Sequence, residues 1–212
     1  GMMFFILYQQ MATSINFYTI KWINHKILGF NLNPLTFQSL NPMWIIIISV
    51  PLAKFYQRLN NKKIDQPSYF KFPIGLFICS IAFFILFVST FFGNIGHISF
   101  WWLVLFFLFQ ASGELLSSAL GVAMIADFVP QKIRGLFMGI WFVFMAIAGY
   151  FGSWLATFST PSKHLLNQGS TVLPYRYLFI NLSWVTFIIS IIFFAITIVL
   201  HKKYTKIKKL YE

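Results

Sequence analysis

The sequence predicts an all-α protein that crosses a membrane several times, and three observations support this. Hydrophobic residues make up 58% of the 212 residues and charged residues only 9%. The mean hydropathy of +0.75 is too high for a water-soluble domain of this length. Long apolar runs alternate with short segments that carry clustered basic residues. Together these features predict an integral membrane protein built from helices.

Six segments are long and apolar enough to cross a bilayer. A spanning helix needs roughly 17 to 25 mostly apolar residues to match the thickness of the hydrocarbon core. The predicted spans are Met2–Ile20, Phe37–Leu59, Tyr69–Phe92, Phe100–Val129, Leu136–Phe158 and Tyr177–Leu200. They predict six transmembrane helices in one bundle, followed by a basic tail at residues 201–212.

The first two spans contain polar residues and prolines. Gln9 and Gln10 lie within "FFILYQQMATS", and Pro42 and Pro51 lie within "FQSLNPMWIIIISVPLAKFY". A proline removes one backbone hydrogen bond from a helix, and a membrane tolerates the freed group where a neighbouring helix or a cavity satisfies it. Asn41 precedes Pro42 directly. This segment is therefore either a simple kink or part of a ligand site.

The fourth span carries an acid, Glu114, near its middle. A charge at the bilayer centre costs about 2.5 to 3.5 kcal/mol on insertion scales, so such residues usually face a cavity or a partner. Gln110, Glu114 and Ser118 are spaced by four residues and form one polar stripe on a helix. We expect Glu114 to face a cavity and to exchange a proton. The alternative is a neutral carboxyl bonded to a neighbouring helix.

Small residues recur at four-residue spacing in the fourth and fifth spans. This pattern lets two helix backbones approach closely and predicts a compact bundle. The residues concerned are Gly113, Ser117 and Gly121, then Gly135 with Gly139, and Gly149 with Ser153.

Two further residues near the ends of these spans allow ordinary interpretations. Trp141 lies just over a turn inside the fifth span, where a tryptophan usually packs or anchors at the interface and less often lines a binding site. Asp127 lies near the end of the fourth span, where we expect an ion pair with Lys132 or Arg134.

The formal charge of +12 comes from basic clusters beside the apolar spans. The Arg58 to Lys71 loop, Lys132 with Arg134, and the lysine tail fall on one side of the predicted topology. The positive-inside rule then places both termini in the cytoplasm. Bases in such positions orient the protein and attract anionic lipid, so we do not expect nucleic-acid binding.

No motif indicates an enzyme, a metal site or a cofactor site. The four histidines fall in predicted loops or the tail, and the single cysteine, Cys79, lies in an apolar run. One cysteine excludes an internal disulfide and a thiolate metal cluster. We therefore interpret Cys79 as a small buried hydrophobic residue.

Three segments together resemble a known family of transporters. They are "ILYQQMATSINFYTI", "FQSLNPMW" and "GELLSSALGVAMIADFVPQKIRGLFMGIWF". They resemble the C-terminal half of the proton-dependent oligopeptide transporters of the major facilitator superfamily, and most of all the enterobacterial di- and tripeptide permeases. The likeness covers essentially the whole chain. It implies a multi-pass protein of a bacterial inner (cytoplasmic) membrane, in which these six spans form the C-terminal bundle.

The resemblance also implies roles for four residues. Glu114 of the "GEL" motif would lie in the central cavity, recognise the peptide amino group and take part in proton coupling. Asn41 of the "NP" motif would bind the peptide backbone, and Trp141 of "GIWF" would line a side-chain pocket. Ser118 would be a cavity neighbour. Protons are the implied coupling ion, with no cofactor.

The sequence departs from the family pattern at a few positions. Gln9 and Gln10 stand where many members have an acid followed by glutamine. Ala119 replaces a proline that often follows the serine, and Ala12 replaces a proline of the permease subgroup. The family's N-terminal bundle, with its acidic and arginine-containing signature, is absent from these 212 residues.

The resemblance thus predicts the C-terminal half of a proton-coupled di-/tripeptide symporter, supplying one wall of the peptide cavity. We expect short peptides, a six-helix N-terminal bundle encoded elsewhere and the bilayer as partners, and no peptide transport by this chain alone. Two alternatives stay open: a nonfunctional transporter remnant, and a self-associating channel or structural membrane protein. Glu114 with Asn41 and Trp141 favours the transporter over the structural protein, which has no need of that set.

Overall fold

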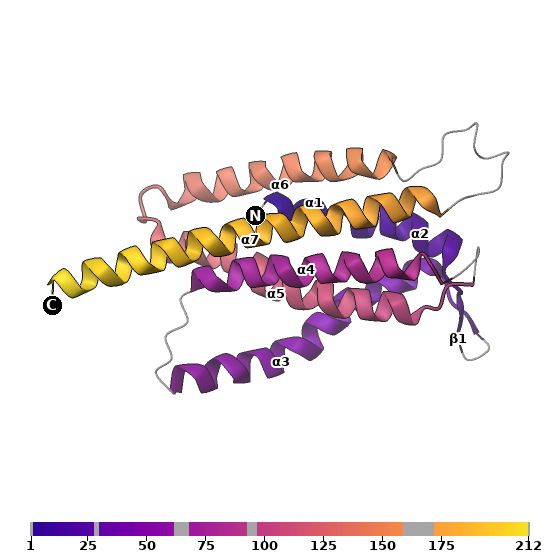
Figure 1. Cartoon of the computed structure of the whole chain (residues 1–212), viewed down its shortest axis with the longest axis horizontal. Coiled ribbons are helices and arrows are strands. Elements are labelled where there is room, and N and C mark those ends of the chain that lie inside the picture. Colours follow the sequence, from indigo (N-terminus) through magenta and orange to yellow (C-terminus); the bar gives the residue numbers. More distant parts are fainter. Residues whose placement is uncertain (1, 28–29, 62–67, 93–96, 159–171, 212) are drawn as a thin grey trace.

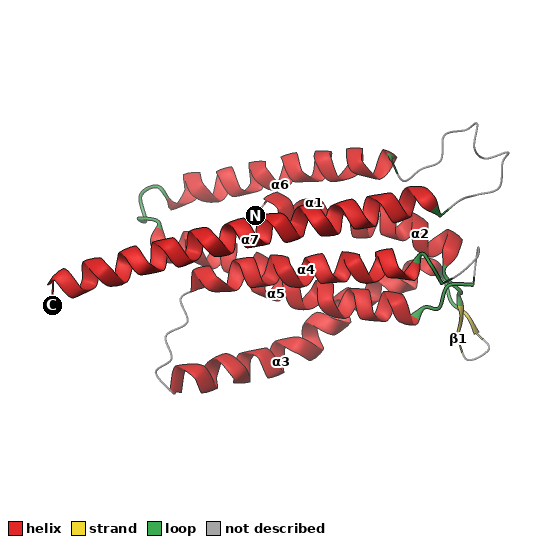
Figure 2. Cartoon of the chain, in the orientation of Figure 1, coloured by secondary structure: helices red, strands yellow, loops and turns green. Residues whose placement is uncertain are grey.

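Helices form nearly all of the chain that the computed structural model describes, namely residues 2–27, 30–61, 68–92, 97–158 and 172–211 (Figures 1 and 2). In order they are α1 (Met2–Ala12), α2 (Ser14–Trp22), the 3-10 helix η1 (Pro34–Ser39), α3 (Leu40–Asn61), α4 (Ser68–Ser89), α5 (Trp101–Phe128), α6 (Arg134–Thr157) and α7 (Leu173–Tyr211). Two short strands, β1 (Lys26–Ile27) and β2 (Phe30–Asn31), form an antiparallel hairpin between α2 and η1.

The all-α membrane prediction is confirmed. Within the described residues, four helical segments are long and apolar enough to span a bilayer: Pro34–Leu59, Phe70–Ser89, Arg134–Thr157 and Leu173–Lys202. They correspond to the second, third, fifth and sixth predicted spans. The fourth predicted span is the continuous 28-residue helix α5. The number of six transmembrane helices stays a prediction.

The first predicted span is divided into α1 and α2 at Thr13. Thr13 leaves the helical backbone region, with φ −113° and ψ −96°. Its hydroxyl donates to the carbonyl of Gln9 at 2.9 Å, and the Ser14 hydroxyl donates to the side chain of Gln10 at 2.7 Å. Hydroxyls that bond to the preceding turn compete with regular helical bonding, which gives a local reason for the break.

The prolines of the second span have different positions in the fold. Pro42 lies in the first turn of α3, directly after η1, where a missing backbone N–H costs little. Asn33 caps η1, because its side-chain oxygen accepts the N–H of Leu35 at 3.0 Å. Pro51 lies inside α3 and removes one helical hydrogen bond there.

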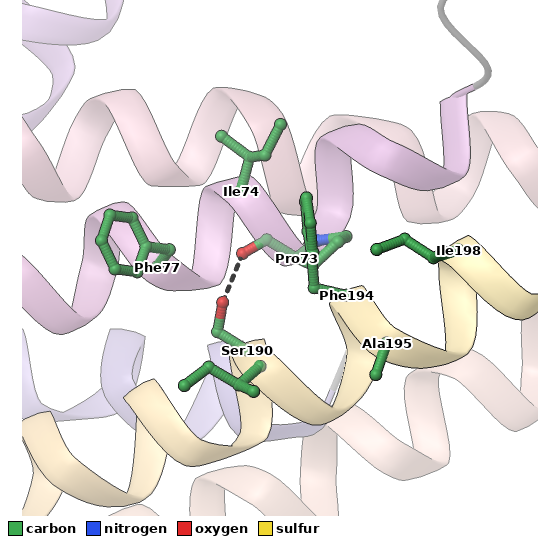
Figure 3. Close-up of a pocket in the computed structure, with 8 residues that line it drawn as sticks. Pro73, Ile74, Phe77, Ser190, Phe194, Ala195 and Ile198 are labelled. Atoms are coloured by element: carbon green, nitrogen blue, oxygen red, sulfur yellow. Dashed lines mark hydrogen bonds between the residues drawn. The ribbon is translucent and has the colours of Figure 1, made fainter.

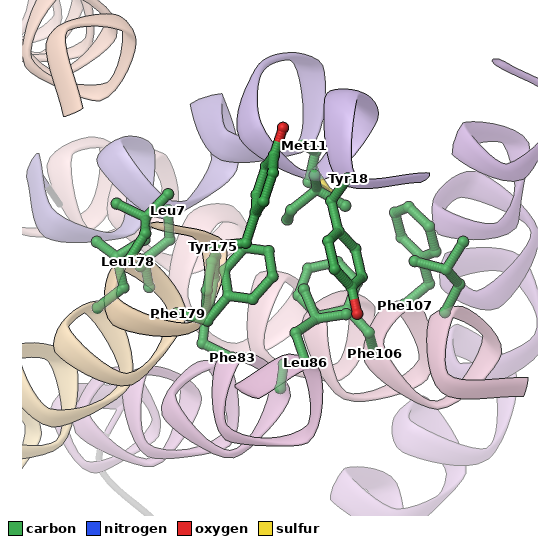
Figure 4. Close-up of a cluster of buried hydrophobic side chains, with 14 of the residues drawn as sticks. Leu7, Met11, Tyr18, Phe83, Leu86, Phe106, Phe107, Tyr175, Leu178 and Phe179 are labelled. Carbon is green, nitrogen blue, oxygen red and sulfur yellow. The ribbon is translucent and has the colours of Figure 1, made fainter. Parts of the chain in front are cut away.

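A cluster of buried rings joins α2, α4, α5 and α7 (Figure 4). The rings of Tyr18 and Phe179 meet edge to face at 5.2 Å, and those of Phe83 and Phe106 at 5.5 Å. The Tyr18 hydroxyl lies 2.8 Å from that of Ser89, so the polar atom of this ring is also satisfied. Lipid tails are as apolar as these side chains, so close packing and such bonds hold the helices together.

The helices α3 and α6 lie on the outside of the bundle (Figure 1). The helix α4 packs along both α5 and α7, whereas α3 packs mainly on α5 and α6 mainly on α1. Large apolar side chains on the outer helices are exposed, including Ile46 at 70% and Tyr150 at 73%. These faces are open to lipid or to a further protein surface.

The small residues form two seams, that is, stripes along which another helix could approach closely. The seam at Gly113 of α5 is packed, and the seam at Gly135, Gly139 and Gly149 of α6 is open. A Cβ on Gly113 would collide with the Sγ of Cys79 and lie 2.7 Å from the carbonyl of Gly75, so α4 and α5 touch through their backbones. The expected close approach is therefore confirmed at Gly113. On α6, a Cβ on Gly135, Gly139 or Gly149 would meet nothing within 4 Å. Among the residues that the structure describes, these three glycines pack on no other helix, so the close approach that we expected from them is not found there.

A pair of identical substitutions distinguishes the two seams. Gly113→Ala should lower the free energy of unfolding by about 1–3 kcal/mol, because the added methyl overpacks a backbone contact. Gly139→Ala should be neutral or stabilise α6 by up to about 1 kcal/mol through helix propensity. Unfolding of the purified chain in detergent, followed by tryptophan fluorescence, measures both. Equal effects of the two substitutions would contradict the packed seam.

Candidate functional site

The structure brings Asn41 and Glu114 together. The Asn41 Nδ2 donates a hydrogen bond to Oε2 of Glu114 at 3.0 Å, between the first turn of α3 and the middle of α5. Asn41 is only 6% exposed, and Glu114 is half-buried. The Oδ1 of Asn41 is buried and accepts no hydrogen bond from the described residues. The pair therefore offers both a carboxyl oxygen and an unused amide oxygen.

Two more helices, α4 and α1, lie beside this pair. Gly113 precedes Glu114 and packs on Cys79 and Gly75 of α4, so the position of the acid is fixed by a backbone contact. Tyr8 of α1 lies close enough to interact electrostatically with Glu114. Sequence reasoning missed Tyr8, although it stands directly before the Gln9–Gln10 pair.

The polar stripe of α5 is described in part. Gln110 is completely buried one turn before Glu114, and both polar atoms of its amide are without a hydrogen-bond partner among the described residues. The side chain of Ser118 lies outside the described residues. Its predicted place beside the acid therefore stays a prediction.

Trp141 of α6 packs against α1. Its ring packs edge to face on Phe5 of α1, with centroids 5.6 Å apart. The two rings, together with Met2 and Phe144, line a cavity of about 320 Å³ between α1 and α6. Within the described residues no hydrogen bond or ring contact joins Trp141 to the acid, and its predicted role in a peptide side-chain pocket stays a prediction.

Gln9 and Gln10 connect α1 to α6. The Nε2 of Gln10 donates to the carbonyl of Gly152 at 2.8 Å, and its oxygen accepts the Ser14 hydroxyl. Gln9 donates to the Ser153 hydroxyl at a longer 3.4 Å. A Cβ on Gly152 would lie 2.7 Å from Cβ of Gln9, so these helices also approach closely.

The expected ion pair of Asp127 lies outside the described residues, because the side chain of Asp127 is among those not described. Arg134, one of its two expected partners, donates from Nη2 to the backbone carbonyl of Val129 at 3.4 Å. This contact joins the start of α6 to the end of α5.

Comparison with known proteins decides the family. The sequence model described as the POT family matches residues 1–172. The chain belongs to the POT family. It is 40% identical over 193 residues to the dipeptide and tripeptide permease B of Salmonella typhimurium, and 41% identical over 193 residues to that of Xenorhabdus bovienii. Each alignment covers 91% of this chain and 40% of the relative.

Solved structures show the same relationship. A peptide transporter POT in complex with sulfate superposes with a TM-score of 0.79 at 26% identity, over 92% of this chain and 37% of that one. The tetrameric PepTSo2 gives 0.77 at 30% identity, over 95% and 41%. The chain therefore has the all-α major facilitator fold of POT transporters, and it spans about two fifths of the length of these relatives.

A double-mutant cycle tests the pair at the centre of the site. Asn41→Ala and Glu114→Ala should be coupled by about 0.5–1.5 kcal/mol in the free energy of unfolding, because either change removes the same hydrogen bond. Ser190→Ala serves as the control, because it removes a hydrogen bond between α4 and α7. The effects of Glu114→Ala and Ser190→Ala on the free energy of unfolding should add within about 0.5 kcal/mol. Unfolding in detergent measures all variants, and an additive Asn41–Glu114 cycle would show that the two side chains do not interact.

Proposed function

We propose that this chain forms one wall of the peptide cavity of a proton-coupled di- and tripeptide symporter. The hydrogen bond between Asn41 and Glu114 carries the proposal. It joins an acid and an amide inside an apolar bundle. Burying such groups costs free energy, and where they occur they usually mark a functional site. Family membership and the permease relatives support peptides as the substrate class.

The pair matches the chemistry of a short peptide. The carboxylate of Glu114 can bind the terminal ammonium group in a charge-assisted hydrogen bond. The amide of Asn41 can accept a peptide N–H at its unused oxygen and donate to a peptide carbonyl. Trp141 and Ser118 line other parts of the same cavity in this proposal, with Trp141 beside side chains of the peptide.

Glu114 also links peptide binding to a proton. Protonation removes the negative charge of the carboxyl and with it the attraction for an ammonium group. Proton and peptide therefore change each other's affinity at this residue, and such a coupling is reciprocal. This linkage gives Glu114 its role in proton coupling.

The second wall comes from an N-terminal six-helix bundle, because alternating access requires two bundles that move about a central site. The exposed faces of α3 and α6 support such a partner, and so do the unpacked glycines Gly135, Gly139 and Gly149. Small residues are the type that lets a further helix approach closely. The assembled protein lies in the bacterial inner membrane, with both termini of this chain in the cytoplasm.

Reconstitution tests the transport role. The chain would be co-expressed with the N-terminal bundle of the Salmonella typhimurium permease, and uptake of a labelled dipeptide measured in proteoliposomes under an inward proton gradient. We expect no uptake by the chain alone, uptake by the pair, and loss of proton-driven accumulation with Glu114→Gln. Glu212→Gln makes the same chemical change at the last residue and should have no effect.

Uptake by the chain alone, or by discrete oligomers of it, would contradict the need for a second bundle. Equal accumulation with Glu114 and with Gln at that position would contradict the coupling role.

Peptide affinity tests the amide of Asn41 separately. Asn41→Ala in the assembled pair should weaken dipeptide binding by roughly two- to tenfold, which corresponds to the loss of one neutral hydrogen bond. Asn181→Ala removes an exposed amide from α7 and should leave affinity unchanged. Equilibrium binding of a labelled dipeptide measures both, and an unchanged affinity for Asn41→Ala would remove that residue from the site.

A further inference from the structure

A groove between α4 and α7 has almost entirely apolar walls (Figure 3). Its volume is about 360 Å³. The polar groups of its floor are paired with each other, because the Ser190 hydroxyl donates to the carbonyl of Pro73 at 2.8 Å. The apolar lining consists mainly of Ile74, Phe77, Ile191, Phe194, Ala195 and Ile198. A hydrocarbon chain can therefore enter without desolvating an unpaired polar group.

The length of the groove fits one leaflet of a bilayer. Eight residues separate Ser190 from Ile198, which is about 12 Å along a helix. Half of the hydrocarbon core is about 15 Å. Ala195, Ile198 and Lys202 follow one another at spacings of three and four residues, so they share a face of α7. Lys202 lies about 6 Å beyond the groove, at the depth of a lipid headgroup.

The same end of the bundle is basic. Contacts bring three helices together there: the ring of Phe70 on α4 packs on His201 of α7, and the Lys71 ammonium lies 4.0 Å from the ring centroid of Tyr56 on α3. Lys202 is exposed, and the sequence continues with four more lysines. Glu114 is the one acid whose side chain the structure describes, and it is bonded to Asn41.

We propose that this groove binds an anionic glycerophospholipid, with one acyl chain along α4 and α7 and the phosphate beside Lys202. An anionic lipid fits this groove better than a second copy of the chain does. Each copy has a net charge of +12, so two copies would repel each other, whereas a phosphate would attract the lysine. The site does not depend on the transport role, since neither Asn41 nor Glu114 is among the residues that line the groove.

A second apolar groove provides a comparison within the same chain. It lies between α1, α6 and α7, has a volume of about 510 Å³, and includes Val185 in its lining. The arginine near that end of α7, Arg176, is already bonded to Thr90 at 3.0 Å and stacked on the ring of Phe91. This groove has the shape for a hydrocarbon chain but no comparable group of exposed bases among its described residues.

Native mass spectrometry of the full chain in detergent tests the headgroup. Phosphatidylglycerol should bind more tightly than phosphatidylcholine with the same acyl chains, by about fivefold for each lysine that contacts the headgroup. Lys202→Gln should reduce this preference by about fivefold. Lys26→Gln removes the same charge at the opposite end of the bundle and should not reduce it. Equal affinity for the two lipids, or equal effects of the two variants, would overturn the proposal.

Substitutions in the grooves test the acyl chain. Ala195→Phe fills the groove from an exposed position, and should weaken phosphatidylglycerol binding by about fourfold for each methylene displaced. Val185→Phe fills the comparison groove and should have no effect. Phosphatidylglycerol with a photoreactive group in its acyl chain should label the peptide that contains Ile74 and Phe77 in the unmodified chain. Labelling confined to other helices, or a lipid-free dimer as the main species, would overturn the site.

Discussion

The backbone contact between α4 and α5 at Gly75 and Gly113 positions the rest of the bundle. The helix α4 also binds α7, because Ser80 and Ser183 each donate a hydroxyl to the other's backbone carbonyl, at 2.9 and 3.0 Å. Small residues and reciprocal hydrogen bonds thereby hold three long helices together. These are the interactions available where lipid tails provide no hydrophobic driving force between helices. Glu114 follows Gly113 directly, so the seam that packs the bundle also sets the place of its acid.

Polar side chains inside the bundle have two distinct uses. Gln10 bonds to Gly152, and Tyr18 bonds to Ser89, so each satisfies a buried group and joins two helices. Arg176 does the same at one end of the bundle through Thr90. The pair of Asn41 and Glu114 differs from these contacts, because it contains a half-buried acid and an amide oxygen that has no hydrogen-bond partner among the described residues. The contacts of Gln10, Tyr18 and Arg176 join helices, whereas the Asn41–Glu114 pair also keeps an oxygen that could accept a hydrogen bond from a ligand.

Much of the fold could be predicted from the sequence, because apolar length and the placement of bases are local properties of the chain. The break in the helix at Thr13 could not be predicted. It depends on a hydrogen bond from the Thr13 hydroxyl to the preceding turn, and the broken and unbroken helices differ little in stability. The resemblance to family motifs indicated Asn41 and Glu114 as site residues. Their direct contact could not be predicted, because it depends on how α3 packs on α5 and joins residues 73 positions apart in the sequence. Gly113 and Gly139 look alike in the sequence, and only the tertiary arrangement shows that one is packed and the other is open.

The amide of Asn41 explains how a membrane-embedded acid can persist without substrate. An unpaired carboxyl in an apolar bundle is costly in either state, and a carboxylate more so. A hydrogen bond from a neutral amide reduces that cost without adding a fixed positive charge that would compete permanently with a peptide ammonium. A charged partner such as lysine would hold the carboxylate more tightly and would have to be displaced. In the peptide site proposed above, Asn41 would stabilise Glu114 when the site is empty and release it when the ammonium group of a peptide binds.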